Sequence, residues 1–313
     1  MMKYIKDLTE GSRIQGVYFC KSKLSTETKN GKPYESLILQ DKTGLLDTKI
    51  WDPNSLGISE FEAGEYIDVT GDVIIFNNAK QARLTRVRRA QENEYDPADY
   101  MPCSKKNIDE MYAKAVGLVD SIGNTYYREL MELFFKAEEF ASVFKKASAA
   151  KTVHHGFMGG LLEHSLSVAM LCDHLCTMYP ILNRDLLVSA ALLHDIGKTR
   201  ELSAFPQNDY TDEGQLLGHI VMGAMMVDEK IKQIPGFPEG LKTDLEHCIL
   251  AHHGELEFGS PKKPAIIEAL ALSMADNMDA KIETFSEALE AGGSEGWLGF
   301  NKFLDSNIRG TGL

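Results

Sequence analysis

The 313-residue sequence lacks the features that mark membrane, secreted and zinc-finger proteins. It has no apolar run close to the roughly 18 residues that a membrane-spanning helix needs, and no charged-then-apolar leader at its start. Its five cysteines are odd in number, scattered and without the paired spacing of zinc ligands. We therefore expect no membrane partner, a cytoplasmic location and reduced thiols rather than a disulfide framework.

Charge is distributed unevenly along the chain. The net charge is −13, and a strongly acidic surface repels phosphate groups at long range. Residues 1–90, however, carry 14 Lys and Arg against 12 Asp and Glu, whereas residues 91–313 carry 19 against 34. This asymmetry is expected if the front of the chain contacts nucleic acid while the rear has another task, with some of its carboxylates neutralised by metal.

The first 90 residues predict a small all-β barrel. Short runs with strand character alternate with polar, glycine- and proline-containing turns, at 13–23, 34–40, 45–51, 66–75 and 82–88. One pattern resembles strand 2, turn and strand 3 of OB-folds that bind single-stranded nucleic acid, namely Tyr34-x-x-Leu37-x-Leu39-x-Asp41-x-Thr43-Gly44 running on to Trp51. We expect an OB-fold nucleic-acid-binding domain over residues 1–90.

Candidate nucleic-acid contacts in this domain are of two kinds. Aromatic rings can stack on bases and basic side chains can bind phosphates, although strand aromatics more often pack in a core. Basic residues gather at 21–32 and 83–89, at strand ends where an OB face would be lined. The candidates are Tyr34, Trp51 and Phe76 for bases, and Lys21, Lys23, Lys32, Lys49, Arg83 and Arg86 for phosphates.

The middle of the chain changes character. Residues 91–106 are polar and hold two prolines, which predicts a linker. Helical periodicity then takes over. We expect a helical connector over 107–150 and a predominantly α-helical domain over 151–313.

The sharpest chemical feature is an apolar helix at 186–193 that ends in His194-Asp195 and is followed by Gly197 and Lys198. Core packing does not explain an imidazole beside a carboxylate at that position. Adjacent helical residues point about 100° apart, so the two side chains reach one point only where a ligand holds them. A divalent metal ion is such a ligand.

Further metal-capable side chains interrupt apolar helical segments elsewhere, at His164, His219, the His252-His253 pair and Asp276. Burying that many polar groups unpaired would cost several kcal/mol each, so we expect a common partner. The order His…His-Asp…His…His…Asp is the signature of the HD superfamily, whose members include metal-dependent phosphohydrolases. The additional histidines indicate two metal ions rather than one.

The resemblance extends beyond the superfamily. Three segments look like the YhaM family of bacterial 3′→5′ exoribonucleases, which join an N-terminal OB-fold to an HD domain. They are AAKTVHHGFMGGLLEH at 149–164, YTDEGQLLGH at 210–219, and HHGELEFGSP at 252–261 leading to DNMDA at 276–280. The similarity covers nearly the whole chain.

By that resemblance, one metal ion is held by His164, His194, Asp195 and Asp276. Asp195 bridges to a second ion held by His219 and His252, with His253 replacing or joining His252. An imidazole-rich, carboxylate-bridged set suits Mn²⁺ or Fe²⁺ better than Mg²⁺, and the family favours manganese, with another transition metal left open.

Other residues take supporting roles in this interpretation. Asp195 and Lys198 are the catalytic candidates, with Lys198 holding a phosphate oxygen or assisting the leaving group. His154 and His155 are candidates for phosphate contact, and Asp279 for orienting a ligand imidazole. Relatives with three-metal sites carry Glu one turn before the first ligand histidine, where this chain has Gly160, so we expect two ions and disfavour cyclic dinucleotide hydrolysis.

The expected activity is a 3′→5′ exonuclease that threads single-stranded RNA, less readily DNA, across the barrel and releases nucleoside 5′-monophosphates. The HD motif also leaves open a hydrolase of small nucleotides. A nucleic-acid-binding regulator with an inert HD domain, and oxygen chemistry at a di-iron site, are weaker alternatives. The sequence also allows a homo-oligomer.

Overall fold

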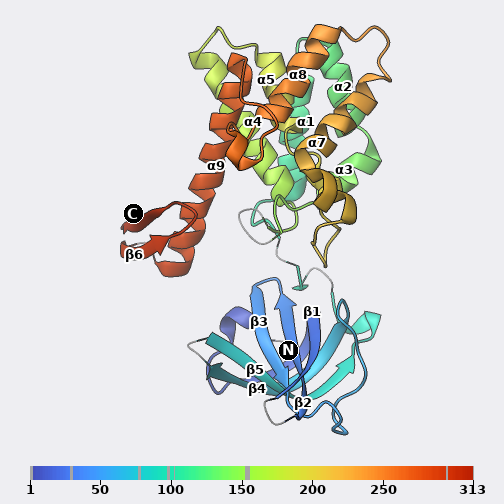
Figure 1. The fold of residues 1–313 in the computed structure, drawn as a ribbon, viewed down its shortest axis with the longest axis vertical. Helices are drawn as coiled ribbons and strands as arrows, with labels where there is room; N and C mark the ends of the chain where they lie inside the picture. The colour runs from blue at the N-terminus through green and yellow to red at the C-terminus, as the bar shows by residue number, and fades with distance from the viewer. Residues whose placement is uncertain are drawn as a thin grey trace. The chain divides into compact units, whose positions relative to one another are not determined.

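The computed structural model describes residues 3–28, 31–76, 79–96, 99–101, 103–151, 156–293 and 295–312, and the chain divides into two compact units (Figure 1). The first unit comprises Met1–Cys103 with Phe205–Gln207, and the second Ser104–Ala204 with Asn208–Leu313. Within the described residues, no helix combines the length and the apolar character that crossing a bilayer requires. The predicted fold class, a β barrel followed by a mainly helical domain, is confirmed.

The first unit is a closed five-stranded barrel with the strand order β1-β2-β3-β5-β4, in which β3 and β5 run parallel and the other pairs antiparallel. Alternating apolar side chains such as Leu37 and Leu39 fill its interior. This order is that of the OB-fold. The strands are β1 (Arg13–Glu27), β2 (Pro33–Asp41), β3 (Gly44–Ile50), β4 (Tyr66–Phe76) and β5 (Ala79–Arg89).

The second unit packs its helices around one apolar core. Asparagine and threonine side chains cap several helix N-termini, and every residue from 186 to 193 is buried, which makes α5 the central helix. The helices are α1 (Ile108–Asp120), α2 (Thr125–Phe135), α3 (Glu138–Phe144), α4 (Gly160–Met178), α5 (Arg184–Leu193), α6 (Lys198–Glu201), α7 (Asp212–Ile231), α8 (Glu239–Ala251) and α9 (Ile267–Gly292).

A β hairpin follows α9, and helical periodicity did not predict it. Strands β6 (Glu295–Asn301) and β7 (Ser306–Thr311) pair antiparallel. Gly293, with φ 101°, caps the C-terminus of α9 and ends the helix. The hairpin is short and exposes aromatic rings, so its sequence lacks the buried alternation that marks a longer strand.

Candidate metal centre

The structure brings all seven predicted metal ligands together in the second unit. Helices α4, α7 and α9 carry His164, His219 and Asp276. The other four lie where a helix ends, with His194 and Asp195 at the C-terminus of α5 and His252 and His253 at the C-terminus of α8. The donor atoms form three overlapping groups, each spanning less than 4.8 Å: His164, His194 and Asp276; His194, Asp195 and His252; His219, His252 and His253.

The first group surrounds the Nε2 atom of His164. This atom lies 3.2 Å from His194 Nε2, 3.1 Å from Asp276 Oδ1 and 3.6 Å from Asp195 Oδ2. Burial alone would lower the pKa of His164, but hydrogen bonds with Asp276 and Asp279 raise it to about 10. This end of the site is therefore strongly negative, which favours a cation.

Three buried atoms beside the first group have no hydrogen-bond partner among the described residues: Asp195 Oδ1, His219 Nε2 and His252 Nε2. The Asp195 oxygen lies 3.4 Å from the His219 nitrogen and 3.6 Å from the His252 nitrogen. Buried polar atoms are rarely left without a partner, and an ion is one recognised reason. Two imidazole nitrogens and a carboxylate oxygen converging in this way fit a divalent metal ion.

The Nδ1 atom of each imidazole ring, on the side away from the centre, already has a hydrogen-bond partner. A backbone carbonyl cannot donate, so a ring nitrogen facing one must carry the proton, and the opposite nitrogen then presents its lone pair. Three rings face carbonyls and two face carboxylates. The Nδ1 contacts are His164 to Asp279 (2.8 Å), His194 to Ala191 (2.8 Å), His219 to Glu201 (3.1 Å), His252 to Ile249 (2.7 Å) and His253 to Phe258 (2.9 Å).

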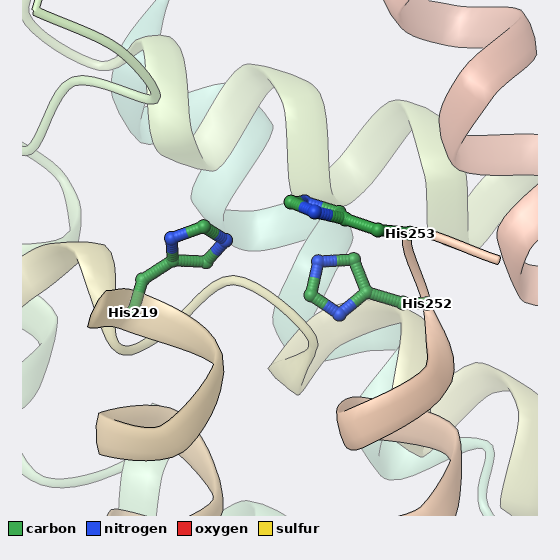
Figure 2. Close-up of side chains that lie close together, drawn as sticks. All are labelled: His219, His252 and His253. Carbon is green, nitrogen blue, oxygen red and sulfur yellow. The ribbon is translucent and has the colours of Figure 1, made fainter. Parts of the chain in front are cut away.

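Figure 2 shows how the ring of His219 faces the adjacent rings of His252 and His253. The centroids of the His252 and His253 rings are 4.4 Å apart and their planes are nearly perpendicular. His252 is almost fully buried and approaches Asp195, whereas His253 is half-buried on the pocket side. The geometry therefore gives His252 the closer approach to Asp195 and leaves His253 at the edge of the site.

Lys198 lies beside this centre. Its ammonium donates to Asp195 Oδ2 at 2.6 Å, the oxygen that faces the first group. Burial alone would raise the pKa of Asp195, but the positive charge of Lys198 and the neighbouring His194 ring lower it well below its usual range. A pocket of about 470 Å³ opens onto the centre, and Lys198, His253, Phe258 and Asn277 are among the residues that line it.

Comparison with known proteins identifies the chain. The HD domain family matches residues 161–281. The 3'-5' exoribonuclease YhaM of Bacillus velezensis is 34% identical over 287 residues, which cover 90% of this chain and 88% of that protein. The protein of the same name from Listeria innocua is 32% identical, over 93% of this chain and 92% of its own length. The chain belongs to the YhaM family.

The resemblance to the YhaM family that the sequence predicted is thus confirmed. The relatives and the HD domain also confirm that the chain is a hydrolase, and they support nuclease activity. Among solved structures, the second OB-fold domain of replication protein A from Methanococcus maripaludis is similar to part of this chain. The match covers 29% of this chain and 97% of that domain. The identity there is 21% and the TM-score 0.24.

In the barrel of this YhaM-family chain, the candidate nucleic-acid contacts differ in how exposed their side chains are. Tyr34 and Trp51 stack on each other with centroids 5.0 Å apart, and Trp51 and Phe76 are exposed. Lys23 is largely buried, because it pairs with Glu35 and donates to a backbone carbonyl. Lys49 contacts Ser36 and Asp47, Lys21 is half-buried, and Lys32, Arg83 and Arg86 are exposed. His154 and His155 lie outside the described residues.

Sequence reasoning missed Glu201. One of its carboxylate oxygens accepts from the backbone nitrogen of His219 at 3.0 Å and from the ring nitrogen at 3.1 Å. Burial alone would raise the pKa of Glu201, but these bonds lower it, so the carboxylate stays ionised. Gly218, with φ 72° and ψ 154°, interrupts α7 and turns the His219 nitrogen towards this partner. The non-helical glycine before the histidine was the available signal.

Gly197 also has a structural role that the sequence did not reveal. A Cβ atom at this position would lie 2.0 Å from the carbonyl oxygen of His219 and 2.7 Å from the nitrogen of Gly223. Glycine therefore allows α7 to approach the segment that follows Asp195. This close approach brings His219 within reach of Asp195.

Proposed function

We propose that the chain is a divalent-metal-dependent 3′→5′ exonuclease that hydrolyses single-stranded RNA, and less readily DNA, to nucleoside 5′-monophosphates. The observation that carries the proposal is the convergence of Asp195 Oδ1, His219 Nε2 and His252 Nε2, buried without a described hydrogen-bond partner beside a second group of donors. The name of the relatives, 3'-5' exoribonuclease YhaM, supplies the direction and the substrate class.

The donor sets divide between two ions. One would be held by His164, His194, Asp195 and Asp276, the other by Asp195, His219 and His252, with His253 available at its edge. The imidazole-rich composition favours Mn²⁺, with Fe²⁺ or another transition metal as the alternative. When bound, such ions lower the pKa of water towards neutrality and neutralise charge on phosphoryl oxygens.

The chain's own side chains organise this chemistry. The two oxygens of Asp195 face different donor groups, which is the arrangement that a bridging carboxylate needs. Asp279 and Glu201 hold the rings of His164 and His219, so that each Nε2 atom points to the centre. Lys198 lines the pocket as a positive group next to Asp195, positioned to bind a non-bridging phosphate oxygen.

The barrel would guide the strand. Exposed Trp51 and Phe76 offer faces for base stacking, and exposed Lys32, Arg83 and Arg86 offer charge for phosphates. Single-stranded nucleic acid is accordingly the proposed partner, with RNA favoured. The cytoplasmic location stays a prediction from the sequence.

The experiment uses the full chain with Mn²⁺ and a single-stranded oligoribonucleotide labelled at its 5′ end. We expect stepwise shortening from the 3′ end, with nucleoside 5′-monophosphates identified by chromatography. Asp195→Asn should abolish the reaction, and Asp173→Asn, which alters a surface ion pair with Arg184, should not. An intact oligomer together with turnover of free nucleotides would replace this proposal by a small-nucleotide hydrolase.

A further inference from the structure

An apolar stripe runs along the outer side of α9, away from the metal centre. It is composed of six large side chains that are each between 38% and 62% exposed: Ile267, Leu270, Met274, Met278, Ile282 and Phe285. At 100° per residue all six fall within about 60° of one direction, whereas Asp276 points to the opposite side. Soluble surfaces seldom carry so long a row of exposed apolar groups without a partner.

No described element covers this stripe. Figure 1 shows the C-terminal half of α9 running beyond the other helices of its unit to the β6–β7 hairpin. The hairpin covers only the last turn, where Leu298 lies against Gly292. The contacts of α9 with α4, α5 and α8 use its other side, on which Ala269, Leu272 and Ala275 are buried.

The spacing of the stripe is symmetric. Successive members are 3, 4, 4, 4 and 3 residues apart, so the row reads the same from either end. A second α9 laid antiparallel, with the two-fold axis level with residue 276, sets Leu270 opposite Ile282 and Met274 opposite Met278. Ile267 then meets Phe285. Each contact occurs twice, as in an isologous two-fold interface.

We propose that the α9 stripe is the interface through which two copies of this chain form an antiparallel two-fold dimer.

The exposed area is sufficient for this partner. A large apolar side chain of about 200 Å², exposed by about half, contributes roughly 100 Å², so the six residues offer about 600 Å² per copy. Trp297 and Phe300 on the adjoining hairpin are 72% and 64% exposed. They pair with Arg309 and Asn307, which lie two residues apart on β7, so the two rings share one face of the hairpin. The six stripe residues alone give about 1,200 Å² over two copies, which is the lower end of the range for specific interfaces.

The stripe itself carries little charge. At 100° per residue the six acidic residues of α9 lie at least 100° from the centre of the stripe, and Lys281 is the one charged residue of the helix within it. A single lysine is too few for a phosphate backbone or an anionic lipid surface, which are bound through clusters of basic residues. The two methionines at the centre of the stripe can adapt to each other across an axis, because their side chains are unbranched and flexible.

The test measures the mass of the full chain in solution by sedimentation velocity at micromolar concentration. We expect twice the 34.8 kDa of a single chain. Leu270→Glu and Ile282→Lys should each halve the measured mass, because each places a charge against an apolar partner. Leu56→Glu, a matched change at a fully exposed apolar residue of the barrel, should leave the dimer intact.

Charge exchange tests the register. In a chain carrying both Leu270→Glu and Ile282→Lys, each glutamate faces a lysine of the other copy, so the dimer should return. The Leu270→Glu/Ile282→Glu chain should stay monomeric, with an unchanged circular dichroism spectrum. A monomeric natural chain, a Leu270→Glu chain that remains dimeric, or a Leu270→Glu/Ile282→Lys chain that stays monomeric would overturn the proposal. So would a monomer that binds lipid vesicles through this stripe.

Discussion

Glu201→Gln changes the residue that orients His219 and leaves every proposed metal ligand in place. The carboxylate oxygen that accepts from the His219 backbone and ring nitrogens becomes part of a neutral amide. The amide oxygen still accepts a hydrogen bond, but the negative charge that fixes the ring and raises the basicity of its Nε2 atom is lost. We expect the ring to bind metal more weakly.

The expected size follows from the two hydrogen bonds at 3.0 and 3.1 Å that one oxygen supports. Changing such an outer partner of a metal-bound histidine weakens affinity by about 10- to 100-fold. This range corresponds to about 1.4 to 2.7 kcal/mol of binding free energy. The loss should fall on the ion held by His219 and His252 and leave the other ion unaffected.

Isothermal titration with Mn²⁺ measures the affinities of the two ion sites separately. A matched variant, Asp279→Asn, should affect the other site. Asp279→Asn removes the carboxylate charge that faces the His164 ring, so it should weaken the ion held by His164, His194 and Asp276. Glu201→Gln should weaken the other one. Unchanged affinity for both ions in Glu201→Gln, in a chain with normal circular dichroism, would refute the role assigned to Glu201.

Three further predictions concern packing, the barrel and the thiols. Gly197→Ala should lower the free energy of unfolding by about 1 to 3 kcal/mol, because the added methyl overlaps the His219 carbonyl. Gly117→Ala, on an exposed helix face, should raise the free energy of unfolding slightly. Equal denaturation midpoints for the two variants would contradict this. Trp51→Ala should weaken binding of a single-stranded oligonucleotide by about 1 to 3 kcal/mol, measured by fluorescence anisotropy. Tyr179→Ala, on the helical unit, should leave the affinity unchanged. Equal losses in the two variants would count against a stacking role for Trp51. Burial raises the pKa of Cys20 and Cys172 to about 12, so these thiols stay protonated near pH 8 and become thiolates only at much higher pH. Alkylation followed by mass spectrometry should find exposed Cys103 modified first, and early labelling of Cys20 would contradict the structure.

The parts of the fold that local chemistry determines could be predicted from the sequence. The strands were predicted from alternation such as that of Leu37 and Leu39, because one side of a barrel strand faces the core. The metal centre was predicted because His194 and Asp195 follow eight consecutive buried residues of α5, and packing alone explains neither a histidine nor an aspartate at that point. Both signals depend on a few neighbouring residues.

The remaining features depend on contacts between distant residues. Glu201 reaches His219 only because Gly218 breaks the helix and Gly197 lets the two segments approach, and no periodic pattern encodes that combination. The ion pair of Lys198 with Asp195 likewise requires the turn between α5 and α6. The symmetric stripe on α9 became apparent only when burial separated its outer side from the side that packs on the core.

The central claim is that two ions bind between the donor groups on either side of Asp195. Anomalous diffraction from crystals grown with Mn²⁺ tests it most directly. We predict two peaks, one among His164, His194 and Asp276, the other beside His219 and His252, with Asp195 in contact with both. A single peak, or density with no manganese at either group, would contradict the account.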